Sequence, residues 1–215
     1  MPESAPLKSA PPKSAPLKIV LDEGALATRT RDLAAEIAAD HPDGVVLVGV
    51  LKGALVFLAD IARHIREVDV AIDFLAISRY APDSGRVRLL KDLDLDITDR
   101  DVVIVEDLVD TGLTLAYLVQ HLTVRGARRV EVCALLDRSD RRIVPLPLRY
   151  VGMEIPGDAF VLGYGLHVGD RYRNLPFIAR ADPAVLAADP DAYLSLYGQQ
   201  HREERKASSA RDAAP

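Results

Sequence analysis

Residues 102–114 read Val-Val-Ile-Val-Glu-Asp-Leu-Val-Asp-Thr-Gly-Leu-Thr, and this stretch decides the expected fold. The β-branched run at 102–105 is typical of a strand that is buried on both faces of a sheet. We expect an acidic loop at 106–112, followed by a helix from about Thr114 to Arg125. A buried strand that leads through a loop into a helix is one unit of a parallel α/β sheet.

The same alternation of strand and helix extends outward from this stretch in both directions. Apolar residues at three-and-four spacing predict helices, and continuous apolar runs predict buried strands. The predicted elements are helices at 23–40 and 55–65, strands at 45–50, 70–77 and 130–136, and short strands near 150–153, 159–162 and 176–180. This order predicts an α/β fold with a doubly wound, mainly parallel sheet that is flanked by helices and joined by right-handed crossovers.

Size, composition and charge limit the classes of protein to which the chain can belong. Its 215 residues are 49% hydrophobic, which suits one domain with a full core. The 27 basic and 32 acidic side chains give a formal net charge of -5, which argues against a nucleic-acid partner. The apolar runs are too short to span a bilayer, so we expect no membrane partner. The one cysteine, Cys133, lies in an apolar run, and we expect a buried thiol in a reducing, cytoplasmic setting.

Both ends of the chain have compositions that do not favour folding. Residues 1–16 repeat Ser-Ala-Pro with interspersed Pro and Lys, and they lack the apolar core of a secretory signal. Residues 199–215 are charged and rich in Ala and Ser. We therefore expect a disordered tail at 1–16, one folded domain at 17–198 and a flexible tail at 199–215.

The polar half of the opening stretch has the chemistry of a site for a sugar phosphate. In open α/β sheets the ligand crevice lies at the carboxyl ends of the strands, where these residues are expected. Glu106 and Asp107 can hold ribose hydroxyls and the water shell of a Mg²⁺ ion. Free backbone N–H groups, the positive end of the helix and two hydroxyls predict an anion socket for one phosphate. The residues of this socket are Asp110, Thr111, Gly112, Leu113 and Thr114.

This segment resembles the phosphoribosyl pyrophosphate motif of type I phosphoribosyltransferases, and its Glu-Asp-x-x-Asp-Thr-Gly form is similar to that of the hypoxanthine-guanine phosphoribosyltransferases. The resemblance extends from about Leu17 to Ala181. Four further matches occur in the family's order: Leu-Lys-Gly-Ala at 51–54, Leu-Lys-Asp-Leu-Asp at 90–94, Val-Gly-Met-Glu-Ile-Pro at 151–156 and Tyr-Arg-Asn-Leu-Pro at 172–176. The resemblance implies a type I phosphoribosyltransferase fold with a small hood over the site, in a homodimer or homotetramer.

The resemblance also implies a reaction. The family's enzymes join hypoxanthine or guanine to 5-phosphoribosyl pyrophosphate with Mg²⁺ as cofactor, and they release the nucleotide and pyrophosphate in purine salvage. Two alternatives stay open: a phosphoribosyltransferase for another base such as xanthine, and a non-catalytic regulator that senses phosphoribosyl pyrophosphate. Retention of Asp110 and Tyr80 favours an enzyme.

On the side of the leaving group, the resemblance assigns roles to four residues. Lys52 and Gly53 bind pyrophosphate after a cis peptide bond between Leu51 and Lys52. Arg173 matches the arginine that contacts pyrophosphate as its negative charge grows. Tyr80 matches the tyrosine of a lid at 78–88, which would exclude water from the reaction.

On the side of the base, the resemblance makes Asp110 the acceptor of the purine N7 proton. Phe160 would stack on the purine, and Val161 would offer backbone groups to its edge. Three positions depart from the family pattern. Arg79 replaces the serine before the lid tyrosine, and Arg138 replaces the lysine that donates to the purine 6-oxygen. His167 replaces an aspartate near the purine 2-position that helps ligate a second Mg²⁺, so we expect guanine to be used less well than hypoxanthine.

Overall fold

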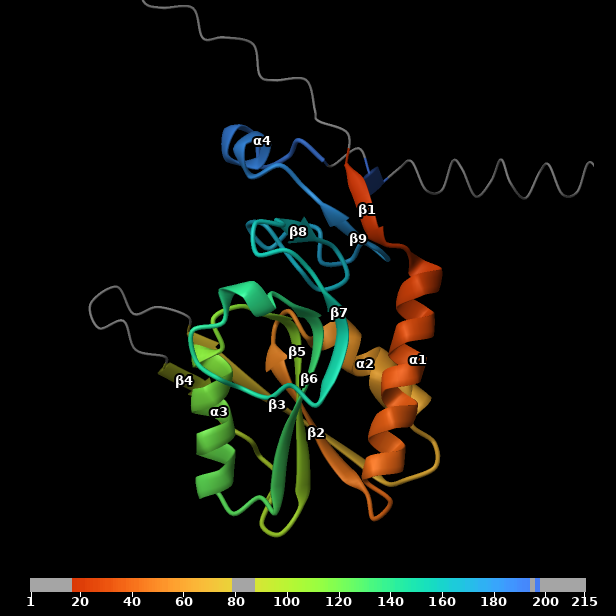
Figure 1. Cartoon of the computed structure of the whole chain (residues 1–215), viewed down its shortest axis with the longest axis vertical. Coiled ribbons are helices and arrows are strands. Elements are labelled where there is room, and N and C mark those ends of the chain that lie inside the picture. The colour runs from red at the N-terminus through yellow and green to blue at the C-terminus, as the bar shows by residue number, and fades with distance from the viewer. Residues whose placement is uncertain (1–16, 79–87, 194–195, 198–215) are drawn as a thin grey trace, which may run out of the picture.

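The computed structural model describes residues 17–78, 88–193 and 196–197 (Figure 1). The predicted tails at 1–16 and 199–215 lie outside these residues, as do Arg79, Tyr80 and most of the predicted lid. The two ends of that lid, Ser78 and Arg88, belong to strands instead of a loop.

A six-stranded sheet with the order β4-β3-β2-β5-β6-β7 forms the centre of the molecule. Every neighbouring pair is parallel except β3 and β4. The strands are β2 (Val45–Leu51), β3 (Val70–Ser78), β4 (Arg88–Lys91), β5 (Asp101–Val109), β6 (Arg129–Asp137) and β7 (Tyr150–Glu154). The predicted doubly wound, mainly parallel sheet is therefore confirmed.

The helices cover both faces of this sheet (Figure 1). They are α1 (Glu23–Asp40), α2 (Leu55–His64) and α3 (Leu113–Val124), all close to their predicted bounds. Alternate side chains of each strand divide the core: Leu47 and Val103 pack with α1 and α2, whereas Val46 and Val102 pack with α3. This division explains why the strands read as continuous apolar runs, since both of their faces are buried.

Strand β5 is longer than the sequence indicated, and this corrects the predicted acidic loop at 106–112. Glu106 pairs with Ala134, and the ladder to β6 continues as far as Val109. Glu106 and Asp107 are 4% and 6% exposed, so both acids belong to the sheet instead of a solvated loop. Backbone pairing with β6 satisfies the main chain here, which local sequence chemistry cannot reveal.

A smaller layer lies above the carboxyl ends of the main strands and forms the expected hood (Figure 1). It contains the three-stranded sheet β1-β9-β8, made of β1 (Lys18–Leu21), β9 (Ile178–Arg180) and β8 (Val161–Leu162), together with α4 (Pro183–Ala188). Its own apolar cluster includes Tyr172 and Phe177. The sequence did not predict β1, because four residues are too few for a periodic signal.

The Leu-Lys-Asp-Leu-Asp motif at 90–94 ties the segment after β4 to the sheet and to α3. Asp92 contacts His121 Nε2 at 3.1 Å and Arg125 Nη1 at 2.6 Å. Asp73 accepts from the backbone N–H groups of Asp94 and Leu95, at 2.8 and 2.9 Å. The motif therefore anchors the segment after β4 to β3 and to the end of α3.

None of the helices in the described residues has the length and apolar character that crossing a membrane requires.

Candidate active site

Two adjoining cavities lie at the carboxyl ends of the main strands, below the hood. The β2 cavity has a volume of about 410 Å³ and the α3 cavity about 260 Å³, and Leu108 and Arg138 line both. The β2 cavity brings together eight predicted residues: Lys52, Gly53, Asp107, Arg138, Phe160, Val161, His167 and Arg173. The α3 cavity brings together six: Glu106, Asp110, Thr111, Gly112, Thr114 and Arg138. Leu113 begins α3 beside this cavity and is 52% exposed.

The turn after β2 has the backbone form that the resemblance implied. The Leu51–Lys52 peptide bond is cis. A β-carbon at Gly53 would lie 1.8 Å from Asp107 Oδ2, and one at Gly165 would lie 2.1 Å from the Gly53 carbonyl oxygen. The turn is therefore packed between β5 and the hood, and only glycine fits at these two positions.

Gly112 makes the sharp entry into α3 that an anion socket requires. It has a φ of 83° and precedes the first helical residue, Leu113. Its carbonyl accepts from Ala116 N at 2.9 Å, which starts the helical hydrogen-bond ladder. The first N–H groups of a helix have no partner within the helix, and they favour an anion at that end. Thr111 and Thr114 line the same cavity, and the Thr111 hydroxyl accepts from the backbone N–H of Leu113 at 3.4 Å.

Glu106 and Asp107 do not act as one pair of neighbouring carboxylates. Successive residues of a strand point to opposite faces, so Glu106 lines the α3 cavity and Asp107 lines the β2 cavity. Across residues 17–78, 88–193 and 196–197, no group of three or more His, Cys, Asp or Glu side chains could hold a metal ion. A Mg²⁺ ion held by either acid would take further oxygen ligands, such as waters and substrate phosphates.

Asp110 lies beside two arginines where the cavities meet. Its Oδ2 atom is 3.6 Å from Arg138 Nη1, and its Oδ1 atom is 3.2 Å from Arg141 Nε. Arg138 also donates to the carbonyl oxygen of Ala159 at 2.5 Å, directly before Phe160. The guanidinium of Arg138 thus connects the acid to the expected base wall. No sequence motif pointed to Arg141, because it contacts Asp110 only where the segments after β5 and β6 come together.

Asp170 is a second residue that the sequence did not single out. It accepts from Arg173 Nη2 at 3.0 Å and lies 3.5 Å from Lys52 Nζ. Its backbone N–H donates to His167 Nδ1 at 3.1 Å. The Arg173 hydrogen bond, followed by the charge of Lys52, holds the pKa of Asp170 below its ordinary value. The hood therefore supplies an anion next to both expected pyrophosphate ligands.

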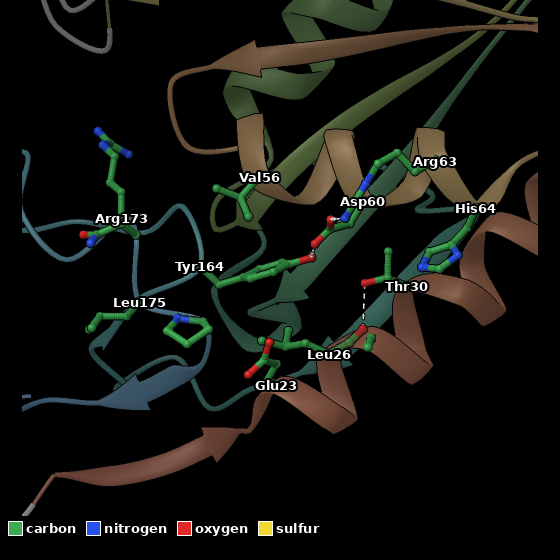
Figure 2. A pocket seen from close by; sticks show the side chains of 13 residues that line it. Glu23, Leu26, Thr30, Val56, Asp60, Arg63, His64, Tyr164, Arg173 and Leu175 are labelled. Carbon is green, nitrogen blue, oxygen red and sulfur yellow. Dashed lines mark hydrogen bonds and ion pairs between the residues drawn. The ribbon is translucent and has the colours of Figure 1, made fainter. Parts of the chain in front are cut away.

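A further cavity of about 410 Å³ opens between α1, α2 and the hood (Figure 2). Figure 2 shows Tyr164 reaching across it, and its hydroxyl donates to Asp60 at 2.5 Å. Burial, followed by this hydrogen bond, raises the pKa of Tyr164 above its ordinary value. Arg173 lines both this cavity and the β2 cavity, and so forms part of the wall between them.

The phosphoribosyl transferase domain model matches residues 17–168. The chain belongs to the phosphoribosyl transferase family. The match includes every described residue predicted for the site except Arg173, so the resemblance stated from the motifs is confirmed at the level of family.

Individual relatives of this phosphoribosyl transferase carry a narrower description. The hypoxanthine-guanine phosphoribosyltransferase of Mycobacterium avium is 48% identical over 158 residues, which are 72% of this chain and 75% of the relative. That of Bacillus subtilis (strain 168) is 41% identical over 172 residues, which are 78% of this chain and 94% of the relative. A crystal structure of such an enzyme from Bacillus anthracis has a TM-score of 0.73 and 42% identity, and the match covers 77% of this chain and 98% of that one.

Proposed function

We propose that this chain is a purine salvage transferase that joins hypoxanthine, and guanine less well, to 5-phosphoribosyl pyrophosphate. The products are IMP or GMP and pyrophosphate. Relatives at 41% and 48% identity with the corresponding name support this proposal. The observation that supports the proposal most directly is the position of Asp110 beside Arg138, where the phosphate socket meets the expected base wall.

The carboxylate of Asp110 and the guanidinium of Arg138 complement the hydrogen-bonding groups on one edge of a 6-oxopurine. The purine N7 and the 6-oxygen are neighbours on that edge, so an acceptor and a donor that lie side by side can serve both. Asp110 would take the N7 proton as N9 attacks the ribose C1′, and Arg138 would donate to the 6-oxygen. The 6-amino group of adenine would instead face the donors of Arg138, which disfavours adenine.

Other residues of the β2 cavity would bind the leaving group. Lys52 and Arg173 both line this cavity, and their side chains carry charge opposite to that of pyrophosphate. As the bond between C1′ and oxygen lengthens, negative charge grows on pyrophosphate, and the two cations would stabilise it. Little covalent chemistry is required of the protein, so positioning and charge supply the rate enhancement.

Glu106 and Asp107 suit Mg²⁺ that arrives with the substrate. Magnesium prefers oxygen ligands, and in such sites it is held by one or two carboxylates together with waters and substrate phosphates. Two buried carboxylates that line adjoining cavities fit this arrangement better than a cage made by the protein alone. When bound, the ion would neutralise charge on the departing diphosphate.

A screen of bases tests the proposal. The purified protein is given phosphoribosyl pyrophosphate and Mg²⁺ with hypoxanthine, guanine, xanthine or adenine in turn, and the nucleotide formed is measured. We expect the highest kcat/KM with hypoxanthine and no turnover of adenine. Preference for xanthine would support the alternative of another base, and binding of phosphoribosyl pyrophosphate without turnover would support a regulator.

The homodimer or homotetramer stays a prediction of the resemblance, and the cytoplasmic setting stays a prediction from the single cysteine. Sedimentation equilibrium of the full chain would measure the state of association.

A further inference from the structure

The Asp170 carboxylate lies between the two cations of the β2 cavity. Its Oδ1 atom accepts a hydrogen bond from Arg173 Nη2 at 3.0 Å, and both of its oxygens lie 3.5 Å from Lys52 Nζ. The lowered pKa of Asp170 keeps this carboxyl group charged at neutral pH. An anion that belongs to the protein is therefore already paired with both of the cations that face the expected leaving group.

Other contacts already hold the Arg173 guanidinium and the backbone of Lys52 in place. Arg173 donates through Nη1 to the carbonyl oxygen of Gly165 at 2.6 Å, which fixes its guanidinium to the hood. The backbone of Lys52 is held by the packing of the turn against β5 and Gly165. The side chains of Lys52 and Asp170 are 68% and 63% exposed, and such ion pairs contribute little order. Asp170 therefore contributes little to the positioning of the two cations.

The larger effect is electrostatic. Carboxylate and phosphoryl oxygens accept hydrogen bonds from the same ammonium and guanidinium donors. A diphosphate carries several negative charges at neutral pH, and each of them is repelled by a carboxylate a few ångströms away. Bound diphosphate and the Asp170 carboxylate thus compete for the same donors, which are the side chains of Lys52 and Arg173.

We infer that Asp170 competes with pyrophosphate for Lys52 and Arg173 and so promotes release of this product. The inference rests on the proposed function, which supplies pyrophosphate as the leaving group. Product release limits turnover in many enzymes, so a competing anion at this place would keep kcat high while it raises KM for phosphoribosyl pyrophosphate.

The test is calorimetric titration of inorganic pyrophosphate with Mg²⁺ into the wild type, Asp170→Asn and Asp170→Glu. Asp170 has a φ of 61°, and asparagine adopts this backbone conformation as readily as aspartate, so the first variant keeps the turn. We expect Asp170→Asn to bind pyrophosphate about five-fold more tightly, because one like charge at close range is removed. The Asp170→Glu variant keeps the charge and should bind as the wild type does.

Steady-state kinetics separate competition from a structural role. If Asp170 competes with the product, Asp170→Asn lowers both kcat and KM for phosphoribosyl pyrophosphate, whereas a damaged site would raise KM. The matched control is Glu36→Gln, which removes an exposed carboxylate paired with Arg29 at 3.0 Å on α1. This variant should leave both constants unchanged.

The outcomes are distinct. Weaker or unchanged binding of pyrophosphate by Asp170→Asn overturns the inference while the wild type still forms nucleotide. If the wild type neither binds pyrophosphate nor forms any nucleotide, the proposed function fails, and the inference fails with it.

Discussion

The two ends of the main sheet differ in how deeply their paired ionisable side chains are buried. At the amino ends of β5 and β6, the buried His41 ring lies between Asp101 and Glu131, with nitrogen-to-oxygen distances of 3.0 and 3.2 Å. At the carboxyl ends, the paired side chains are more exposed: Asp110, which lies beside Arg138, is 36% exposed, and Lys52 and its partner Asp170 are 68% and 63% exposed.

This difference separates side chains that stabilise the fold from side chains that are available to bind a ligand. Close, buried pairs are satisfied within the protein, and removal of one partner leaves the other desolvated and unpaired. Exposed pairs add little to stability, and their donors remain available to phosphate and base. Substitutions at the amino end should therefore change stability, and those at the carboxyl end should change activity.

The largest expected effect is that of Asp110→Asn. Loss of the proton acceptor should lower kcat with hypoxanthine by about 1,000-fold, within the range for a general base. The melting temperature should stay unchanged, since the Asp110 side chain is 36% exposed and ion pairs at the surface add little to stability. Steady-state rates and thermal unfolding measure the two quantities. A variant that turns over at the wild-type rate would remove Asp110 from the mechanism.

Gly53→Ala should lower kcat/KM by about 100-fold, because displacement of the turn by an ångström misplaces its backbone donors. The new β-carbon would lie 1.8 Å from Asp107 Oδ2. The matched control is Gly24→Ala on α1, where the nearest atom would be 3.4 Å away and activity should not change. Equal kinetics for the two variants would show that the turn tolerates a side chain.

Asp101→Asn should act in the opposite sense to Asp110→Asn. Asp101 accepts from Arg128 Nε at 2.8 Å, and chiefly this bond holds the pKa of its carboxyl at about 2. The variant should lose about 2 kcal/mol of unfolding free energy at pH 7, with kcat/KM unchanged below its melting temperature. Chemical denaturation measures the loss. A large loss of activity without a loss of stability would refute the comparison.

The same carboxyl predicts a pH dependence. A lowered pKa means that the stabilisation is fully present above about pH 4, the ordinary value, and is lost as the pH falls toward 2. The unfolding free energy of the wild type should therefore decline through this window. Asp101→Asn should show a shallower decline, and an identical slope would contradict the assignment.

The smallest expected effect is that of His167→Asp. His167 lines the β2 cavity, and a carboxylate there restores an oxygen ligand that suits Mg²⁺. We expect kcat/KM for guanine to rise several-fold relative to hypoxanthine. The ratio of the two constants is the readout, and a ratio equal to that of the wild type would exclude His167 as the cause of base preference.

Features with a local signal could be predicted from the sequence. The helix at 23–40 and the strand at 45–50 follow from periodicity and apolar runs, and their bounds agree with α1 and β2. The glycine-containing turns after β2 and β5 were recognised from their motifs, and the predicted residues do line adjoining cavities.

Features that depend on distant partners could not be predicted. Strand β5 extends through Glu106 because β6 pairs with it, and that extension directs the two acids to different cavities. Arg141 and Asp170 join the site only through contacts between separate segments of the fold. Short elements such as β1 gain their stability from pairing with another strand of the sheet. A four-residue sequence pattern contains no information about that partner.

The most direct test of the account is the stoichiometry of the wild-type reaction. Hypoxanthine, phosphoribosyl pyrophosphate and Mg²⁺ are mixed with the protein, and IMP, pyrophosphate and ribose 5-phosphate are quantified together. The account predicts IMP and pyrophosphate in equal amounts without ribose 5-phosphate. Pyrophosphate accompanied by ribose 5-phosphate in place of IMP, or no product from any base, would contradict it.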